Sequence, residues 1–315
     1  MELGRVPLFE ELADAKSVLI AGAGGGFDVY CGLPLYFALQ RRGKQVHLAN
    51  LSFAGKPRGE ESKFSPTLFQ VTASSGGSDS YFPEKVLAQW FRERGEEITV
   101  SCFELSGVKP LQDAYETVVA SYDIDTIVLV DGGTDSLMRG DESGLGTPAE
   151  DIASIAAVHA LQVPRKLLVC LGFGVDHFHG VSHHDFLEAV AELTREGAFY
   201  GAFSLLPGMP EGRAYLEAVD YANSRTRRAS IVNSSIASAI EGRFGDYHRT
   251  DRTQGSELWI NPLMAQYFCF DLMAVARRVQ YLSLIRQTEM LFEITAIIEA
   301  HRKQIGIRRR FGIPL

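Results

Sequence analysis

Four carboxylates follow one short apolar run, and their chemistry is that of a site for a cation or for hydroxyl groups. Residues 127–130 are apolar, and Asp131, Asp135, Asp141 and Glu142 come directly after them. Carboxylate oxygens bind hard divalent cations, hydrogen-bond the hydroxyl pair of a ribose, or act as general bases. Turns also favour aspartate, but four acids at one strand end favour a site. We expect all four as metal ligands, with Asp131 and Asp135 also as catalytic groups.

A second candidate is the glycine-rich stretch 22–28, GAGGGFD, which follows another apolar run. Consecutive glycines after a buried strand can bring backbone N–H groups close to a phosphate or carboxylate, so this stretch is expected to bind an anion. The dinucleotide fingerprint fails at Phe27, where it requires a third glycine, and at Asn50, where it requires an acid. A P-loop is excluded because no lysine followed by serine or threonine comes after the glycines. We therefore expect no NAD or flavin, and Asp28 either caps a helix or contacts the ligand.

Four histidines, His177, His179, His183 and His184, fall within eight residues after a third apolar run. His177 and His179 are two positions apart, so in an extended segment they share one face and could bind one group or move protons. His183 and His184 fall in the first turn of a predicted helix, where the helix dipole favours the neutral imidazole that binds metals. A polar turn with histidines facing water is the simpler alternative. Which histidine acts stays open.

The spacing of apolar residues predicts the elements that must position these groups. Strands are expected at residues 17–21, 45–51, 68–73, 98–105, 127–130, 167–171 and 199–205, and helices at 83–94, 110–122, 211–225 and 230–240. Thr147, Pro148 and Glu150 have the spacing of a capping box, which predicts a further helix start. The alternation of strands and helices is typical of an α/β fold.

The expected architecture is a Rossmann-like, doubly wound, mainly parallel sheet with a helical C-terminal annex. Ligands of such sheets bind beyond the carboxyl ends of the strands, so Gly24, Asp131 and Gly174 should lie near one edge. No repeat or low-complexity linker divides the chain, which favours a single domain over residues 1–315. Residues 257–315 are expected to form a mainly helical extension packed on it, with two helices between Asn261 and about residue 298.

Composition limits the class of protein. The chain has 315 residues, 46% of them hydrophobic and 22% charged, as in globular proteins with a substantial core. Its net charge of −8 argues against a nucleic-acid partner. No apolar run approaches membrane-spanning length, the N-terminus lacks signal-peptide features, and the four cysteines have no paired spacing. We expect a cytoplasmic protein with no membrane partner, and a homo-oligomer is left open.

Three motifs together resemble a family of prokaryotic proteins of unknown function, DUF1152. They are GAGGGFD at 22–28, DGGTDSL at 131–137 with GDE at 140–142, and WINPLM at 259–264. The resemblance spans nearly the whole chain and implies no reaction, cofactor or catalytic residue.

The leading functional expectation is an enzyme that hydrolyses, or transfers a group from, a small anionic metabolite such as a nucleotide, nucleoside or sugar phosphate. The candidate catalytic residues are Asp131, Asp135, His177 and His179. The residues expected to bind the ligand are Gly22, Gly24, Gly25, Gly26, Asp28, Gly132, Gly133 and Asn261. Mg²⁺, Ca²⁺ or Mn²⁺ would assist. Two alternatives stay open, a non-catalytic nucleotide sensor and a transition-metal hydrolase that uses the histidines 177–184.

Overall fold

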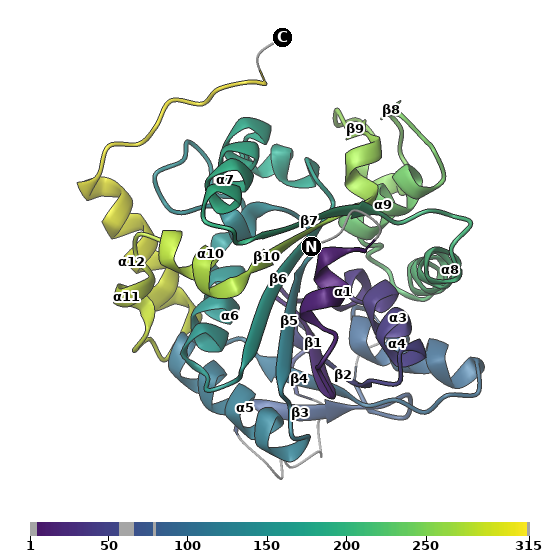
Figure 1. Ribbon diagram of the computed structural model, residues 1–315. Coiled ribbons are helices and arrows are strands. Elements are labelled where there is room, and N and C mark those ends of the chain that lie inside the picture. Colours follow the sequence, from purple (N-terminus) through teal and green to yellow (C-terminus); the bar gives the residue numbers. More distant parts are fainter. Residues whose placement is uncertain (1–4, 57–65, 78–79, 314–315) are drawn as a thin grey trace.

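An eight-stranded sheet forms the centre of the molecule (Figure 1). The computed structural model describes residues 5–56, 66–77 and 80–313. Across the sheet the strand order is β3-β4-β2-β1-β5-β6-β10-β7. The strands are β1 (Ser17–Gly22), β2 (Gln45–Ser52), β3 (Leu68–Val71), β4 (Val100–Glu104), β5 (Thr126–Asp131), β6 (Arg165–Leu171), β7 (Phe199–Ser204) and β10 (Gln266–Asp271). A separate hairpin pairs β8 (Gly245–Asp246) with β9 (Trp259–Ile260).

Helices cover both faces of the sheet. One face carries α5 (Val108–Ser121), α6 (Pro148–Ala160), α7 (His183–Arg195), α10 (Leu272–Arg278), α11 (Leu282–Ile285) and α12 (Leu291–Gln304). The other carries α1 (Pro7–Glu11), α2 (Asp28–Cys31), α3 (Leu33–Arg41), α4 (Pro83–Glu93), α8 (Pro210–Arg225) and α9 (Ile231–Ile240). Each face packs its own apolar core, which explains why β1 and β5 are buried along their whole length.

The five strands β4, β2, β1, β5 and β6 run parallel, so the sheet is mostly parallel as predicted. From β1 the chain adds β2 and β4 on one side, then crosses to add β5 and β6 on the other. The expected strands and helices up to residue 240 are confirmed within a few residues at each end. Because β1, β5 and β6 are parallel neighbours, Gly24, Asp131 and Gly174 follow their strands at one edge, as expected.

The C-terminal segment corrects one prediction. Residues 266–271, expected to be helical, form strand β10 inside the main sheet, antiparallel to both β6 and β7. Tyr267, Phe268, Cys269 and Phe270 are all buried there. A strand buried on both faces has a continuous apolar run, which cannot be distinguished from a buried helix by periodicity. Three helices follow it, α10, α11 and α12, where the prediction had two, so the end of the chain is helical as expected but differently divided.

None of the helices in the described ranges combines the length and apolar composition that a membrane crossing requires.

Candidate functional site

A cavity of about 300 Å³ opens at the carboxyl edge of the sheet. Gly24 follows β1, Asp131 ends β5, and the short 3-10 helix η2 (Val175–His179) follows β6, so three strand ends contribute to its wall. Residues from the start of α9 and from the segment 252–258 also line it. We call it the carboxylate cavity, because five aspartates line it: Asp28, Asp131, Asp135, Asp151 and Asp176.

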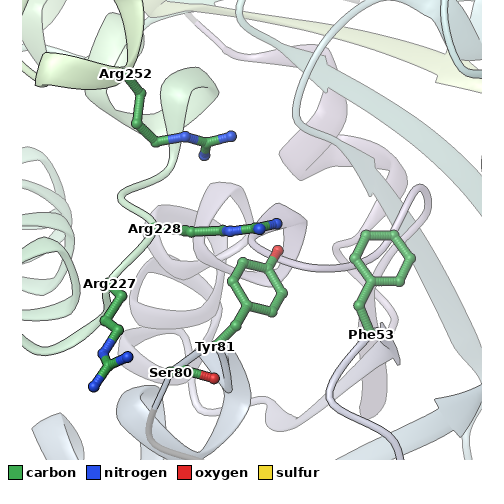
Figure 2. Close-up of a pocket in the computed structure, with 6 residues that line it drawn as sticks. All are labelled: Phe53, Ser80, Tyr81, Arg227, Arg228 and Arg252. Atoms are coloured by element: carbon green, nitrogen blue, oxygen red, sulfur yellow. The ribbon is translucent and has the colours of Figure 1, made fainter.

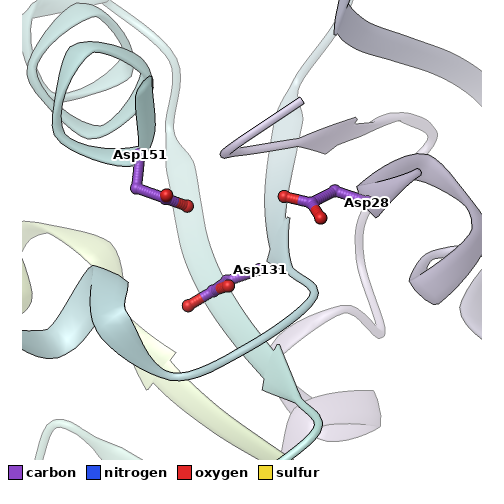
Figure 3. Close-up of side chains that lie close together, drawn as sticks. All are labelled: Asp28, Asp131 and Asp151. Atoms are coloured by element: carbon purple, nitrogen blue, oxygen red, sulfur yellow. The ribbon is translucent and has the colours of Figure 1, made fainter. Parts of the chain in front are cut away.

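Three of these aspartates form the carboxylate cluster, Asp28, Asp131 and Asp151. One oxygen from each lies within 4.8 Å of the oxygens of the other two. Figure 3 shows the three side chains converging on a common space from three separate elements, the start of α2, the end of β5 and the first turn of α6. Within the described ranges, it is the only group of three or more acids, histidines or cysteines that meets this distance.

One fully buried oxygen of the cluster has no hydrogen-bond donor among the described residues. Asp28 Oδ2 accepts from the Gly24 N–H at 2.8 Å. Asp131 Oδ2 accepts from the Ser136 N–H at 3.3 Å and from the Ser136 hydroxyl. Asp151 Oδ1 is buried and accepts no hydrogen bond from any described residue. A buried carboxylate oxygen without a donor is costly unless it is protonated or binds a cation.

Asp135 and Asp176 are held by threonines on either side of the cluster. Asp135 Oδ2 accepts from Thr147 N–H at 2.8 Å and from its hydroxyl at 3.3 Å. Asp176 Oδ2 accepts from Thr134 N–H at 2.6 Å and from its hydroxyl at 3.4 Å. The Thr147 side chain makes no cap hydrogen bond, so the predicted capping box is not formed. Its hydroxyl holds the acidic loop instead.

Burial raises the pKa of every one of these carboxyls. The pKa of Asp28 rises to about 8, first because burial disfavours the charged form, with the charges of Asp135 and Asp176 adding to it. Asp28 keeps part of its surface open to the cavity, but it is otherwise enclosed by protein. Burial also raises the pKa of Asp131 and Asp151 well above the usual range, and neighbouring acids raise it further. Burial therefore favours the protonated form of these three carboxyls, and a bound cation would favour the ionised form instead.

Carboxylates approach the backbone so closely next to the cluster that only glycine fits there. A Cβ on Gly24 would lie 2.8 Å from Asp151 Oδ2, and one on Gly132 would lie 2.6 Å from Asp28 Oδ1. A Cβ on Gly133 would lie 2.6 Å from Asp176 Oδ2. No side chain fits at such distances without moving a carboxylate.

Two backbone N–H groups of the predicted anion-binding loop donate hydrogen bonds to other groups of the protein. Gly24 N–H donates to Asp28, and Gly26 N–H donates to the Leu51 carbonyl at 3.0 Å. Gly25 and Gly26 have positive φ angles of 84° and 59°, which turn the loop back over β2. A Cβ on Gly22 would lie 2.1 Å from Asn50 Oδ1, so glycine at this position leaves the space that the Asn50 side chain occupies.

Two predicted metal ligands, Asp141 and Glu142, lie outside the carboxylate cavity. Asp141 pairs with Arg139 at 3.0 Å and with Arg308 at 2.9 Å. Glu142 accepts from the Arg139 N–H at 3.0 Å and from the Gly140 N–H at 2.8 Å, and it pairs with Arg308 at 3.2 Å. These carboxylates are already neutralised by arginines and amides. Asp28 and Asp151 accompany Asp131 in the cluster instead.

The histidines separate into different environments. His179 lines the carboxylate cavity beside the exposed Phe178. The His177 ring lies 5.0 Å from the His183 ring, and Arg310 contacts it at 3.1 Å. Burial lowers the pKa of His183. His184 packs against Phe311 outside the cavity.

The side chain of Asn261, a predicted ligand-binding residue, forms hydrogen bonds with backbone groups. Its side-chain oxygen accepts from Leu263 N–H at 3.0 Å, and its amide donates to the Trp259 carbonyl at 3.3 Å. The described contacts therefore give it a turn-forming role beside the hairpin β8-β9.

Sequence reasoning missed Asp151, Asp176 and Arg252 as cavity residues. Asp151 stands in the first turn of α6, where acids commonly stabilise the helix dipole, so it gave no separate signal. Asp176 directly precedes His177, and the spacing of the histidines is the stronger signal for a site in this segment. Arg252 lies in a polar loop in which surface exposure explains most charges.

Comparison with known families gave one match, to the family described as "Protein of unknown function (DUF1152)", over residues 66–305. No curated protein and no solved structure matches the chain.

Proposed function

The chain belongs to the DUF1152 family, and we propose that it is an enzyme whose carboxylate cluster binds a divalent cation. The cation would be Mg²⁺, Ca²⁺ or Mn²⁺, because these ions prefer carboxylate oxygens over sulfur or nitrogen ligands. The substrate would be a small phosphorylated metabolite, such as a nucleotide, nucleoside or sugar phosphate. The reaction would be hydrolysis or group transfer.

The observation that carries this proposal is the convergence of Asp28, Asp131 and Asp151. Three acid oxygens within 4.8 Å of one another repel when ionised, by about 1 to 4 kcal/mol per pair at a surface-like dielectric. Protons relieve the repulsion at low pH. A divalent cation relieves it at higher pH, and it also supplies the partner that Asp151 Oδ1 lacks among the described residues.

The same arrangement supports hydrolytic chemistry. Asp28, Asp131 and Asp151 would hold the cation, which would supply the Lewis acidity that activates water for hydrolysis. Asp135 and Asp176 are fixed by threonines at the edge of the cavity, where each has a second oxygen that could accept the proton of the attacking water. His179, exposed at the cavity wall, would exchange protons with the leaving group.

The strand order supports the finer fold class of a doubly wound, Rossmann-like sheet. The order reverses between β1 and β5, and in open α/β sheets ligands bind at that crevice. Gly24 and Asp131 follow these two strands. The four cysteines, Cys31, Cys102, Cys170 and Cys269, are buried free thiols, which supports a cytoplasmic compartment.

Cation binding tests the proposal directly. Isothermal titration of Mg²⁺, Ca²⁺ and Mn²⁺ at pH 8 should show one site in the wild type and none in Asp131→Asn. Asp113→Asn is the matched control, since Asp113 is an exposed acid paired with Lys109 on α5. Release of phosphate or another product from a panel of phosphorylated metabolites then tests catalysis. A wild type that binds no cation, or an Asp131→Asn variant that binds as well as the wild type, contradicts the proposal.

A further inference from the structure

A second cavity, of about 630 Å³, lies beside the carboxylate cavity. Its wall consists of Phe53, Ser80, Tyr81, Arg227, Arg228 and Arg252 (Figure 2). We call it the arginine cavity. Arg252 lines both cavities, so the two are adjacent. These arginines are far in sequence from the glycine loop that was predicted to bind the anion. They come from the segment after α8 and from the loop before β9.

The arginines of this cavity lack the acidic partners that neighbouring arginines have. Among the residues that the structure describes, no carboxylate lies within 4.0 Å of Arg227, Arg228 or Arg252. By contrast, Arg225 pairs with Glu93 at 3.0 Å, and Arg249 pairs with Asp220 at 2.7 Å. In a chain with a net charge of −8, this places unneutralised positive charge at one cavity.

Two of the arginines face the tyrosine. Figure 2 shows the Tyr81 hydroxyl directed toward the guanidinium of Arg228, with Arg252 reaching in from the far side and Phe53 across the space. Arg227 turns away from Tyr81 in this view. The Arg252 guanidinium donates to the Ala229 carbonyl at 2.7 Å, which fixes its position. Two guanidinium groups and a phenol hydroxyl are the donors that phosphate oxygens require.

The glycine loop connects the two cavities. Gly24 contacts the carboxylate cluster, while a Cβ on Gly26 would lie 2.6 Å from the Tyr81 hydroxyl. The Phe27 and Tyr81 rings also meet edge to face, with centroids 5.6 Å apart. One short loop therefore lies against acids of the cluster on one side and against the Tyr81 hydroxyl on the other.

We propose that Arg228, Arg252 and Tyr81 bind the phosphate group of the metabolite whose other end reaches the carboxylate cluster. The inference rests on the proposed function for what occurs at the cluster, but phosphate binding by the arginine cavity can be measured without it. The arrangement resolves a conflict of charge, because an anion held directly among five aspartates would be repelled. The arginines hold the anion apart, and the substrate spans the wall that the two cavities share.

Inorganic phosphate is the first probe, titrated into the cation-free protein and followed by calorimetry and by chemical shifts. We expect Arg228→Ala and Arg252→Ala each to weaken phosphate binding roughly ten- to hundredfold, which corresponds to one lost charged hydrogen bond. Arg195→Ala is the control, because Arg195 is an exposed arginine at the end of α7 that lines neither cavity. Arg228→Lys keeps the charge and should keep part of the affinity. Circular dichroism checks the fold of each variant.

Ribose 5-phosphate and ribose then test whether the bound phosphate belongs to a two-ended ligand. With Mn²⁺ present, ribose 5-phosphate should bind more tightly than inorganic phosphate, and ribose should bind weakly. Equal affinity of ribose 5-phosphate and inorganic phosphate would show an anion site with no link to the cluster, and would overturn the proposal.

Two further results would also overturn it. One is the absence of phosphate binding to the wild type, and the other is phosphate binding that folded Arg228→Ala and Arg252→Ala variants retain. Asp131→Asn separates this inference from the proposed function, since it should abolish Mn²⁺ binding and leave phosphate binding unchanged. If the wild type binds phosphate through these arginines but binds no cation, the proposed function fails while the anion site stands.

Discussion

The Gly24 amide donates a hydrogen bond of 2.8 Å to the carboxylate of Asp28, four residues later in the chain. The glycine loop thus directs an N–H group toward an acid of its own protein. This bond lowers the pKa of Asp28, although burial outweighs it and the net pKa is about 8. The same chemistry that attracts a phosphate to a glycine loop here fixes one member of the carboxylate cluster.

Cation affinity should rise with pH. A proton must leave Asp28 before a cation binds, and its pKa of about 8 means that the acid is largely protonated at pH 6. Below that pKa, affinity should increase about tenfold per pH unit for each proton displaced. Calorimetric titration of Mn²⁺ at pH 6, 7 and 8 measures this slope, and a pH-independent affinity would show that Asp28 does not contribute a ligand.

The cation-free protein should become less stable as pH rises from about 4 to about 8. In the unfolded chain Asp28 has its ordinary pKa of about 3.8, whereas burial raises the pKa to about 8 in the folded protein. Between these values the folded state binds more protons, so the free energy of unfolding falls as pH increases. Urea unfolding in chelator at pH 5 and pH 8 checks the sign, and greater stability at pH 8 would contradict the raised pKa values.

Asp151→Asn should stabilise the cation-free protein at pH 8 and remove the stabilisation by Mn²⁺. Asp151 Oδ1 accepts no hydrogen bond from the described residues, and asparagine removes the cost of burying this carboxyl, whose pKa is raised by burial and by the neighbouring acids. Thermal unfolding with and without Mn²⁺ provides the measurement, with Asp113→Asn as the control. Mn²⁺ stabilisation of Asp151→Asn equal to that of the wild type would exclude Asp151 as a ligand.

Asp135 should contribute to stability as well as to function. Its Oδ2 accepts two hydrogen bonds from Thr147 at the start of α6, so Asp135→Ala leaves these donors unpaired and should cost about 1 to 3 kcal/mol. Asp135→Asn keeps an acceptor oxygen and is the variant for function. An enzyme should lose turnover in Asp135→Asn, whereas a non-catalytic sensor would keep its ligand affinity. Parallel assays of product formation and ligand binding distinguish these two outcomes.

Gly132→Ala should disrupt the cluster, because its Cβ would meet Asp28 Oδ1 at 2.6 Å. We expect a loss of about 1 to 3 kcal/mol in the free energy of unfolding, together with weaker Mn²⁺ binding. Gly208→Ala is the matched control, since Gly208 has open space around its Cβ position. Equal stability and cation affinity of the two variants would show that the backbone at residue 132 tolerates a side chain.

The parallel strands could be predicted from the sequence, because β1, β5 and β6 are short apolar runs that end in glycine or acid or are directly followed by glycine. Asp131 could be placed in the site for the same reason. Asp141 could not be excluded, because Arg308, one of the two arginines that pair with it, lies 167 residues away. Asp151 could not be included, since an acid in a first helical turn has a local explanation.

Strand β10 has a consequence for the order in which the chain can assemble. Strand β7 ends at residue 204 and borders only β10, which begins at residue 266. During synthesis at about 5 to 20 residues per second, the ribosome therefore delivers β7 roughly 3 to 12 seconds before its sole neighbour in the sheet. During that interval one edge of β6 also lacks its neighbouring strand. The unpaired backbone N–H and C=O groups of β6 and β7 can then pair with other nascent chains. Strand β10, the last strand to be synthesised, therefore completes the sheet by pairing with both β6 and β7.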